Sequence, residues 1–133
     1  MTDARIEKIY VDRVRAGEFL DQADRFRSDA DTASLGAESQ SVLLHNATVC
    51  ACDAILQGVG LRVTSGDRAH VLRLETALEQ LDGDTEDLLE SLDASRERRN
   101  EASYTASFVA KASLADAREA TSELLERTRA LLS

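Results

Sequence analysis

Apolar side chains recur at intervals of three and four along most of this chain, which is the spacing that gathers them on one face of an α-helix. At the N-terminus this pattern predicts a helix from about Asp3 to Ser28, with Thr2 as its N-cap. Small and polar residues at positions 28–36 then predict the first connection. The apolar positions that define the first helix are Ile6, Ile9, Tyr10, Ala16, Phe19, Leu20, Ala23 and Phe26.

A second helix is predicted from about Ala37 to Gly58, and its apolar residues cover nearly every side. A helix that is apolar all round is typical of the buried central element of a domain. Gly58 and Gly60 signal its end, and a turn at residues 64–67 leads into the next helix.

Three further helices complete the pattern. A narrow apolar seam predicts a helix from about Arg68 to Leu81, which the Asp-Gly-Asp sequence at 82–84 interrupts. The fourth helix is predicted to start at Asp84 or Thr85 and to run on through residues 96–100, and the last to begin at Ser113 in a near capping box. Five antiparallel helices with short connections predict an all-α, up-and-down helical bundle in a single domain, residues 1–133.

Composition and charge limit the fold classes, ligands and cross-links that are expected for this chain. The 133 residues include no Pro and only 6 Gly, too few chain breakers for the many short strands of an all-β protein. The net charge of −9 disfavours sequence-independent coating of DNA, because an acidic chain repels phosphates at long range. Cys50 and Cys52 point in different directions on a helix and cannot pair locally, so no disulfide framework is expected.

The expected location is cytoplasmic, without membrane association. No apolar run approaches the roughly 20 residues of a transmembrane span, and no signal peptide is evident. The two cysteines and two histidines do not match the spacing of a structural zinc site, so no metal is expected. No P-loop, dinucleotide-binding glycine pattern or nucleophile elbow is present, so no cofactor is expected either.

One segment differs from the acidic background, because Arg96, Arg98 and Arg99 fall within four positions near the end of the fourth helix. These arginines could complement the negative end of the helix dipole. They could also form a phosphate site, since a guanidinium is a permanently charged fork that fits phosphate oxygens. If the helix continues, Arg96, Asn100 and Tyr104 follow one another at one-turn intervals on the same face.

The segment from Arg99 to Tyr104, Arg-Asn-Glu-Ala-Ser-Tyr, resembles the motif of the HEPN superfamily, small helical bundles of prokaryotic toxin–antitoxin and defence systems. The similarity extends to the second helix, to the turn at 64–70 and to residues 113–120. It implies a homodimer in which two copies of the motif face each other. Active members are metal-independent endoribonucleases, in which Arg and His assist attack of a ribose 2′-hydroxyl on the adjacent phosphate.

By this resemblance Arg99, Asn100 and Tyr104 are the candidate catalytic residues, and Arg96 and Arg98 are candidates for binding the RNA phosphates. The sequence departs from the family at Tyr104, which stands where the nuclease motif has His. A phenol with a pKa near 10 is a poor general base at neutral pH.

Three other residues bear on this departure. His70 could approach the Arg99 site and replace the missing base, although a capping or surface role is the alternative. Asp53, on the second helix, is a second possible accessory residue. His45 lies on the same helix and is interpreted as a packed, hydrogen-bonded residue.

Three hypotheses for function follow. The chain is an RNA-directed HEPN-like protein, such as a metal-independent endoribonuclease toxin with a nucleotidyltransferase-like antitoxin as its partner. Alternatively, it is a catalytically inactive HEPN-like dimer that binds a nucleotide, an RNA or a protein partner. The third hypothesis is a plain helical scaffold whose Arg cluster forms ion pairs with its own acidic residues.

Overall fold

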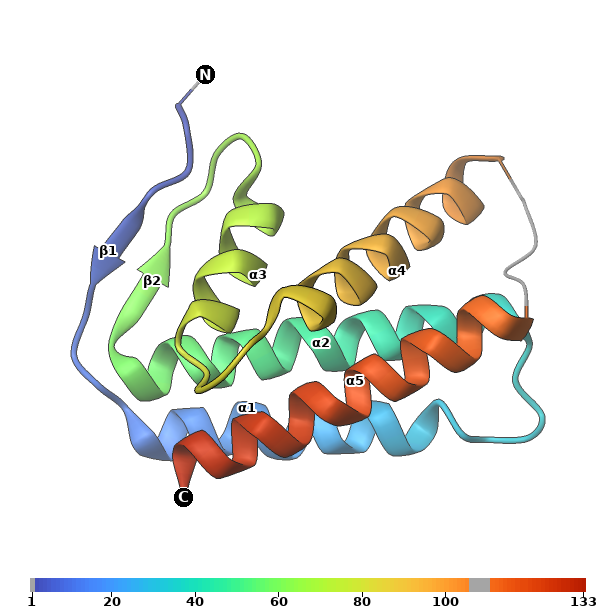
Figure 1. Ribbon diagram of the computed structural model, residues 1–133, viewed down its shortest axis with the longest axis horizontal. Helices are drawn as coiled ribbons and strands as arrows, with labels where there is room; N and C mark the ends of the chain where they lie inside the picture. The colour runs from blue at the N-terminus through green and yellow to red at the C-terminus, as the bar shows by residue number, and fades with distance from the viewer. Residues whose placement is uncertain (1, 106–110) are drawn as a thin grey trace.

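The structure is a helical bundle in which one helix, α2 (Ala37–Val59), contacts all the others. It is a computed structural model that describes the backbone of residues 2–105 and 111–133, and the side chains of residues 2–96 and 113–133. The surrounding helices are α1 (Arg13–Asp29), α3 (Ala69–Glu79), α4 (Glu86–Thr105) and α5 (Lys111–Leu132), shown in Figure 1. The predicted all-α bundle of five helices is confirmed.

Small side chains on α2 allow this close packing. Ala47, Ala51 and Ala54 are completely buried, and they let neighbouring backbones approach the helix from several directions. Larger apolar residues from the other elements fill the remaining space around it. The main core cluster includes Ile55, Leu56, Val63, Leu74, Leu78, Leu88, Leu92, Leu124 and Leu125.

By length and composition alone, α2 is also apolar enough to cross a membrane. The sequence analysis expected no such segment. In the fold α2 packs against α1, α3, α4 and α5, so its apolar residues supply the protein core.

The N-terminal segment is not helical, and here the sequence prediction is wrong. Residues Ile6–Lys8 form strand β1, which pairs antiparallel with β2 (Leu61–Val63) so that Ile6 lies opposite Val63. Helix α1 starts only after Asp12, whose carboxylate caps it by accepting a hydrogen bond from the amide of Arg15 at 3.0 Å. Thr2 is therefore not the N-cap.

A left-handed turn explains the strand pair. Gly60 ends α2 with φ of +78°, which reverses the chain and brings residues 61–63 back beside the N-terminal segment. The amide of Ile9 donates to the carbonyl of Gly60 at 2.9 Å and continues the ladder. Helical spacing of Ile6, Ile9 and Tyr10 could not reveal this partner, which lies more than fifty residues away.

The last helix also begins earlier than predicted. Helix α5 starts at Lys111, so Ser113 lies inside its first turn and is not the N-cap. Lys111 and Ala112 are good helix formers, which favours this extension. Helix α4 continues to Thr105, beyond the predicted residues 96–100. The remaining boundaries lie within about two residues of the prediction, inside the usual uncertainty of helix ends.

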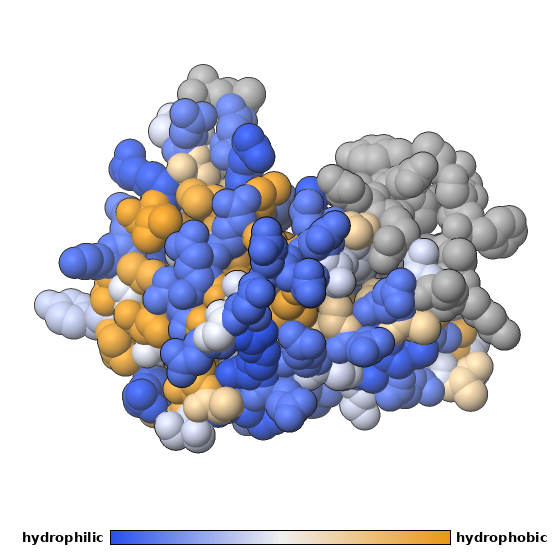
Figure 2. Space-filling view, in the orientation of Figure 1, coloured by the Kyte–Doolittle hydropathy of each residue, from blue (hydrophilic) through white to orange (hydrophobic). Residues whose placement is uncertain are grey.

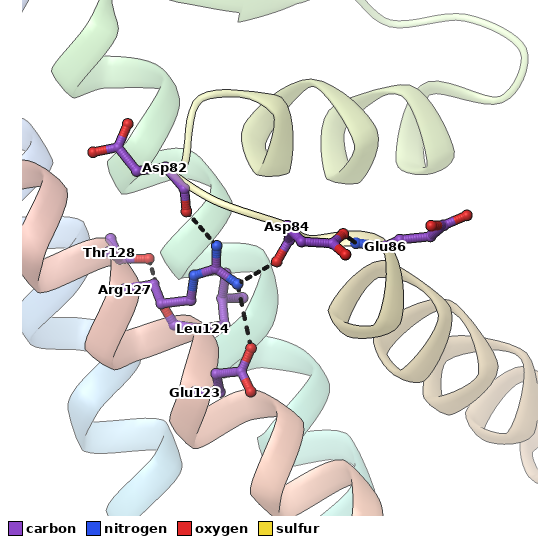
Figure 3. A network of polar contacts seen from close by, with 7 residues as sticks. All are labelled: Asp82, Asp84, Glu86, Glu123, Leu124, Arg127 and Thr128. Carbon is purple, nitrogen blue, oxygen red and sulfur yellow. Dashed lines mark hydrogen bonds and ion pairs between the residues drawn. The ribbon is translucent and has the colours of Figure 1, made fainter.

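Arg127 on α5 fixes the connection between α3 and α4 (Figure 3). Its guanidinium donates to the backbone carbonyl oxygens of Asp82 and Asp84, and it also contacts the carboxylate of Glu123 at 3.4 Å. Asp84 in turn accepts a hydrogen bond from the amide of Glu86 at 2.9 Å, at the first residue of α4. The start of α4 is thereby tied to α5.

We expect Gly60→Ala to destabilise the protein by about 1–3 kcal/mol, because a Cβ at this left-handed position would lie 2.8 Å from the carbonyl oxygen of Ile9. Gly17→Ala is the matched control, since nothing lies within 4 Å of its Cβ and α1 should gain about 1 kcal/mol. Urea unfolding followed by circular dichroism would measure both. Equal shifts for the two variants would contradict the left-handed turn.

Candidate anion pocket between α2, α3 and α4

The predicted motif residues lie on the C-terminal part of α4. The helix continues to Thr105, so Arg96, Asn100 and Tyr104 follow one another at one-turn intervals along it, as the sequence analysis required. The side chains of Arg98, Arg99, Asn100 and Tyr104 are outside the described residues. Arg96 is the one member of the predicted set on α4 whose side chain is described.

Arg96 lines a narrow pocket to which three helices contribute. Helix α2 contributes His45 and Thr48, α3 contributes His70 and Arg73, and α4 adds Ser95 beside Arg96. The apolar part of the lining is Val49, Cys52, Leu74 and Leu92.

The charge of this lining is unusual for the chain. Among the residues whose side chains are described, two arginines and two histidines line the pocket and no carboxylate does, although the chain has a net charge of −9. Three other pockets among the described residues each have at least three carboxylates in their lining. The largest acidic set lies between α4 and α5 and comprises Asp84, Asp87, Asp116, Glu119 and Glu123.

Each of the two arginines pairs with a carboxylate on a neighbouring turn or helix, and neither carboxylate lines the pocket. Asp93 accepts from Nε and Nη2 of Arg96 at 3.2 and 3.1 Å. Asp53 on α2 lies 3.9 Å from Nε of Arg73 on α3. A guanidinium carries five N–H donors, so these pairs orient the two cations without using their full capacity for a ligand.

Asp53, which the sequence analysis named as a possible accessory residue, lies beside the pocket. It does not line the pocket but supports Arg73, which does. Partial burial raises the pKa of the Asp53 carboxyl above its ordinary value, while the nearby charges of Arg73 and Arg15 lower it by less. Asp53 acts on the pocket only through Arg73.

Cys52 lacks the character of a nucleophile at neutral pH. Burial, aided by the charge of Asp53, raises the pKa of its thiol to about 12, so the reactive thiolate is absent. Among the described residues there is also no group of three or more His, Cys, Asp or Glu side chains that could hold a metal ion.

His70 lines the same pocket as Arg96 of α4. Whether it approaches Arg99, as the sequence analysis suggested, stays a prediction because the Arg99 side chain lies outside the described residues. His70 is exposed near the start of α3, at the mouth of the pocket rather than in the core. His45 and Arg73 are the residues that the sequence analysis missed as site residues. His45, Val49 and Cys52 follow one another at intervals of four and three, so they share a face of α2, but nothing in that spacing names the helix opposite.

The interior of the pocket is small, about 30 Å³. Sites that enclose a whole small molecule usually have roughly 300–1,000 Å³. This pocket can hold one or two waters, or part of one anionic group, and leaves the rest of any ligand outside.

Comparison of the chain with protein-family models, with curated proteins and with solved structures found no match.

A pH prediction follows for Asp53. The folded chain holds the proton of this carboxyl to a pH above its ordinary pKa of 3.8, so ionisation of Asp53 costs folding free energy as the pH rises through the raised value. Asp53→Asn avoids that cost. We expect the unfolding free energy of Asp53→Asn, relative to the wild type, to increase as the pH rises from about 3 towards neutrality.

Glu7→Gln is the control with the opposite sign. A hydrogen bond and ion pair with Arg62 hold the pKa of Glu7 below its ordinary value, so the wild type gains stability from this group as the pH rises. The unfolding free energy of Glu7→Gln, relative to the wild type, should therefore decrease over the same pH range. Urea unfolding at several pH values measures both differences, and the same sign for both would contradict the assignment.

Proposed function

We propose that this chain is a HEPN-like, RNA-directed protein that holds one phosphate group of a single-stranded RNA in the pocket between α2, α3 and α4. The observation that carries the proposal is the convergence of His45, His70, Arg73 and Arg96 from three helices on one pocket without carboxylates. Phosphate recognition uses this type of side chain, and arginine in particular binds phosphate oxygens through its fork of N–H donors.

The size of the pocket favours a strand over a free nucleotide. An interior of about 30 Å³ has no room for a base and a ribose, so only phosphate oxygens can enter. The rest of the ligand must lie across the surface. By the family resemblance, Arg98, Arg99 and Asn100, which follow Arg96 in the sequence, are our candidates for contacts with the next phosphates of the same strand.

The two histidines also favour a specific reaction. Histidine can accept and donate protons near neutral pH, which transfer of a phosphoryl group within RNA requires. In that reaction the 2′-oxygen loses its proton to a base and forms a bond to phosphorus, and the bond from phosphorus to the 5′-oxygen breaks. The products are a 2′,3′-cyclic phosphate and a 5′-hydroxyl, and the leaving oxygen receives a proton from an acid.

His70 and His45 are our candidates for the base and the acid, in place of the histidine that Tyr104 replaces. In this form of the proposal the chain is a metal-independent endoribonuclease toxin of the cytoplasm, active as a homodimer, with a nucleotidyltransferase-like antitoxin as its partner. If neither histidine acts on RNA, the same pocket supports the alternative function, a HEPN-like dimer that binds RNA without cleaving it.

For RNA binding, we expect Arg96→Ala and Arg73→Ala each to weaken affinity for a fluorescent single-stranded RNA about tenfold or more, because each removes a phosphate contact of about 1.5–3 kcal/mol. Each variant should also flatten the dependence of affinity on salt. Fluorescence anisotropy at several salt concentrations measures both effects.

Arg129→Ala is the matched control for charge. Arg129 lies on α5 and pairs with Asp24 of α1, at 2.6 Å, so this variant removes one positive charge outside the pocket. A loss of affinity as large as that of Arg96→Ala would show that overall charge, and not the pocket, controls binding.

For cleavage, we expect purified protein to cut cellular RNA in EDTA and to leave cyclic phosphate ends. Arg99→Ala and His70→Ala should each reduce the rate by about 100-fold or more, with unchanged helical content in circular dichroism. RNA that stays intact while the wild type still binds it would assign the non-cleaving function. Cleavage that survives both substitutions would place the activity elsewhere.

A further inference from the structure

The outer edge of β1 is an unpaired strand edge. Among the described residues the sheet has two strands, and Figure 1 shows β1 on its outer side, with β2 between β1 and α3. The carbonyl of Arg5 accepts from the amide of Thr64, and the amide of Ile9 donates to Gly60, both at 2.9 Å. Because alternate residues of an antiparallel strand bond to opposite sides, the backbone groups of Ile6 and Lys8 point away from β2.

Apolar side chains are exposed along the same segment. Ile6, Tyr10, Val11 and Val14 have 47, 96, 55 and 76% of their surface exposed. They are four of the five large exposed apolar side chains among the described residues. Figure 2 shows apolar surface gathered at the end of the molecule where the sheet lies. An unpaired edge beside exposed apolar groups is a typical docking site for another strand.

We infer that β1 pairs antiparallel with β1 of a second copy of this chain, around a two-fold axis at Ile6, to form a four-stranded sheet across the dimer. In this register Ile6 lies opposite the partner's Ile6, and each donates its outward amide to the carbonyl of the other. On the face of the sheet that carries the Ile6 side chain, the row of residues across the four strands is then Val63, Ile6, the partner's Ile6 and the partner's Val63. All four are apolar.

Charge complementarity supports this register and a second copy as the occupant. Arg5 lies opposite the partner's Glu7, and Glu7 opposite the partner's Arg5. Within one chain Glu7 already accepts a hydrogen bond from Arg62 at 2.7 Å. Each Glu7 therefore comes to lie between two arginines, in a row whose charges alternate in sign.

The next two two-fold registers towards the C-terminus lack this match. An axis at Glu7 places Glu7 opposite the partner's Glu7, and an axis at Lys8 places Lys8 opposite the partner's Lys8. Like charges directly opposite each other destabilise a strand pair. The axis at Ile6 is the one of these three that places opposite charges together.

This contact is distinct from the dimer that the family resemblance implies, in which the α4 motifs face each other. Figure 1 places the sheet at one end of the molecule and the C-terminal end of α4 at the other. The inference uses no residue of the anion pocket, so it stands or falls independently of the proposal for RNA.

Ile6→Pro tests the pairing in the full chain. The amide of Ile6 points away from β2, so proline should leave the pair of β1 with β2 intact while it removes the outward donor and blocks the edge. Ile6→Val keeps the donor and the branched side chain and is the matched control. Sedimentation equilibrium over about 1 μM to 1 mM protein measures the association.

We expect a dimer for the wild type and for Ile6→Val, and a monomer with unchanged helical content for Ile6→Pro. A wild type that stays monomeric over the whole range would overturn the inference. So would a dimer that Ile6→Pro does not weaken, because the contact would then lie elsewhere, for example at the α4 motif.

Cross-linking tests the register. In oxidising buffer, Ile6→Cys should form a disulfide with the partner's residue 6, because the two positions meet at the axis within reach of a disulfide. Lys8→Cys lies opposite the partner's Ala4, so two cysteines at position 8 are too far apart to pair. Peptide mapping separates the new bond from Cys50 and Cys52. Cross-linking at position 8 but not at 6 would overturn the register.

Discussion

The burial of α2 on several sides is the constraint on which the rest of this structure depends. Ala47, Ala51 and Ala54 are completely buried, and α1, α3, α4 and α5 each pack directly against it. A helix that must be covered all round forces its neighbours to approach from different directions. Side chains on α3 and α4 are thereby brought over the same face of α2, which is how three helices come to line one pocket.

Electrostatics then gives that pocket its character. In a chain with nine more carboxylates than arginines and lysines, a described arginine usually lies beside an acidic residue. Arg73 and Arg96 are also paired with acidic residues, Asp53 and Asp93, but these two carboxylates do not line the pocket. The result is a small pocket lined by arginine and histidine side chains in an acidic protein, and we propose that it holds one phosphate group.

The N-terminal strand shows where helical periodicity fails as a guide. Ile6, Ile9 and Tyr10 have the spacing of a helix, yet Ile6 and Ile9 extend along β2. A strand of three residues has too few positions to establish a period of two, and its stability comes from a ladder to residues more than fifty positions away. The turn at Gly60 and the cap at Asp12 decide the outcome, and neither can be weighed without the partner strand.

By itself the sequence determined the helices, because their apolar positions and stop signals are local properties of the chain. It also indicated that the second helix, α2, is the central one, whereas the structure shows that α4 continues from Arg96 to Tyr104. Only the tertiary structure decided that His45, His70 and Arg73 line one pocket with Arg96. It also decided that Asp53 pairs with Arg73 and does not line the pocket. Those residues lie on three helices, and which faces of the helices meet depends on how they pack around α2, a contact between distant segments that no local spacing encodes.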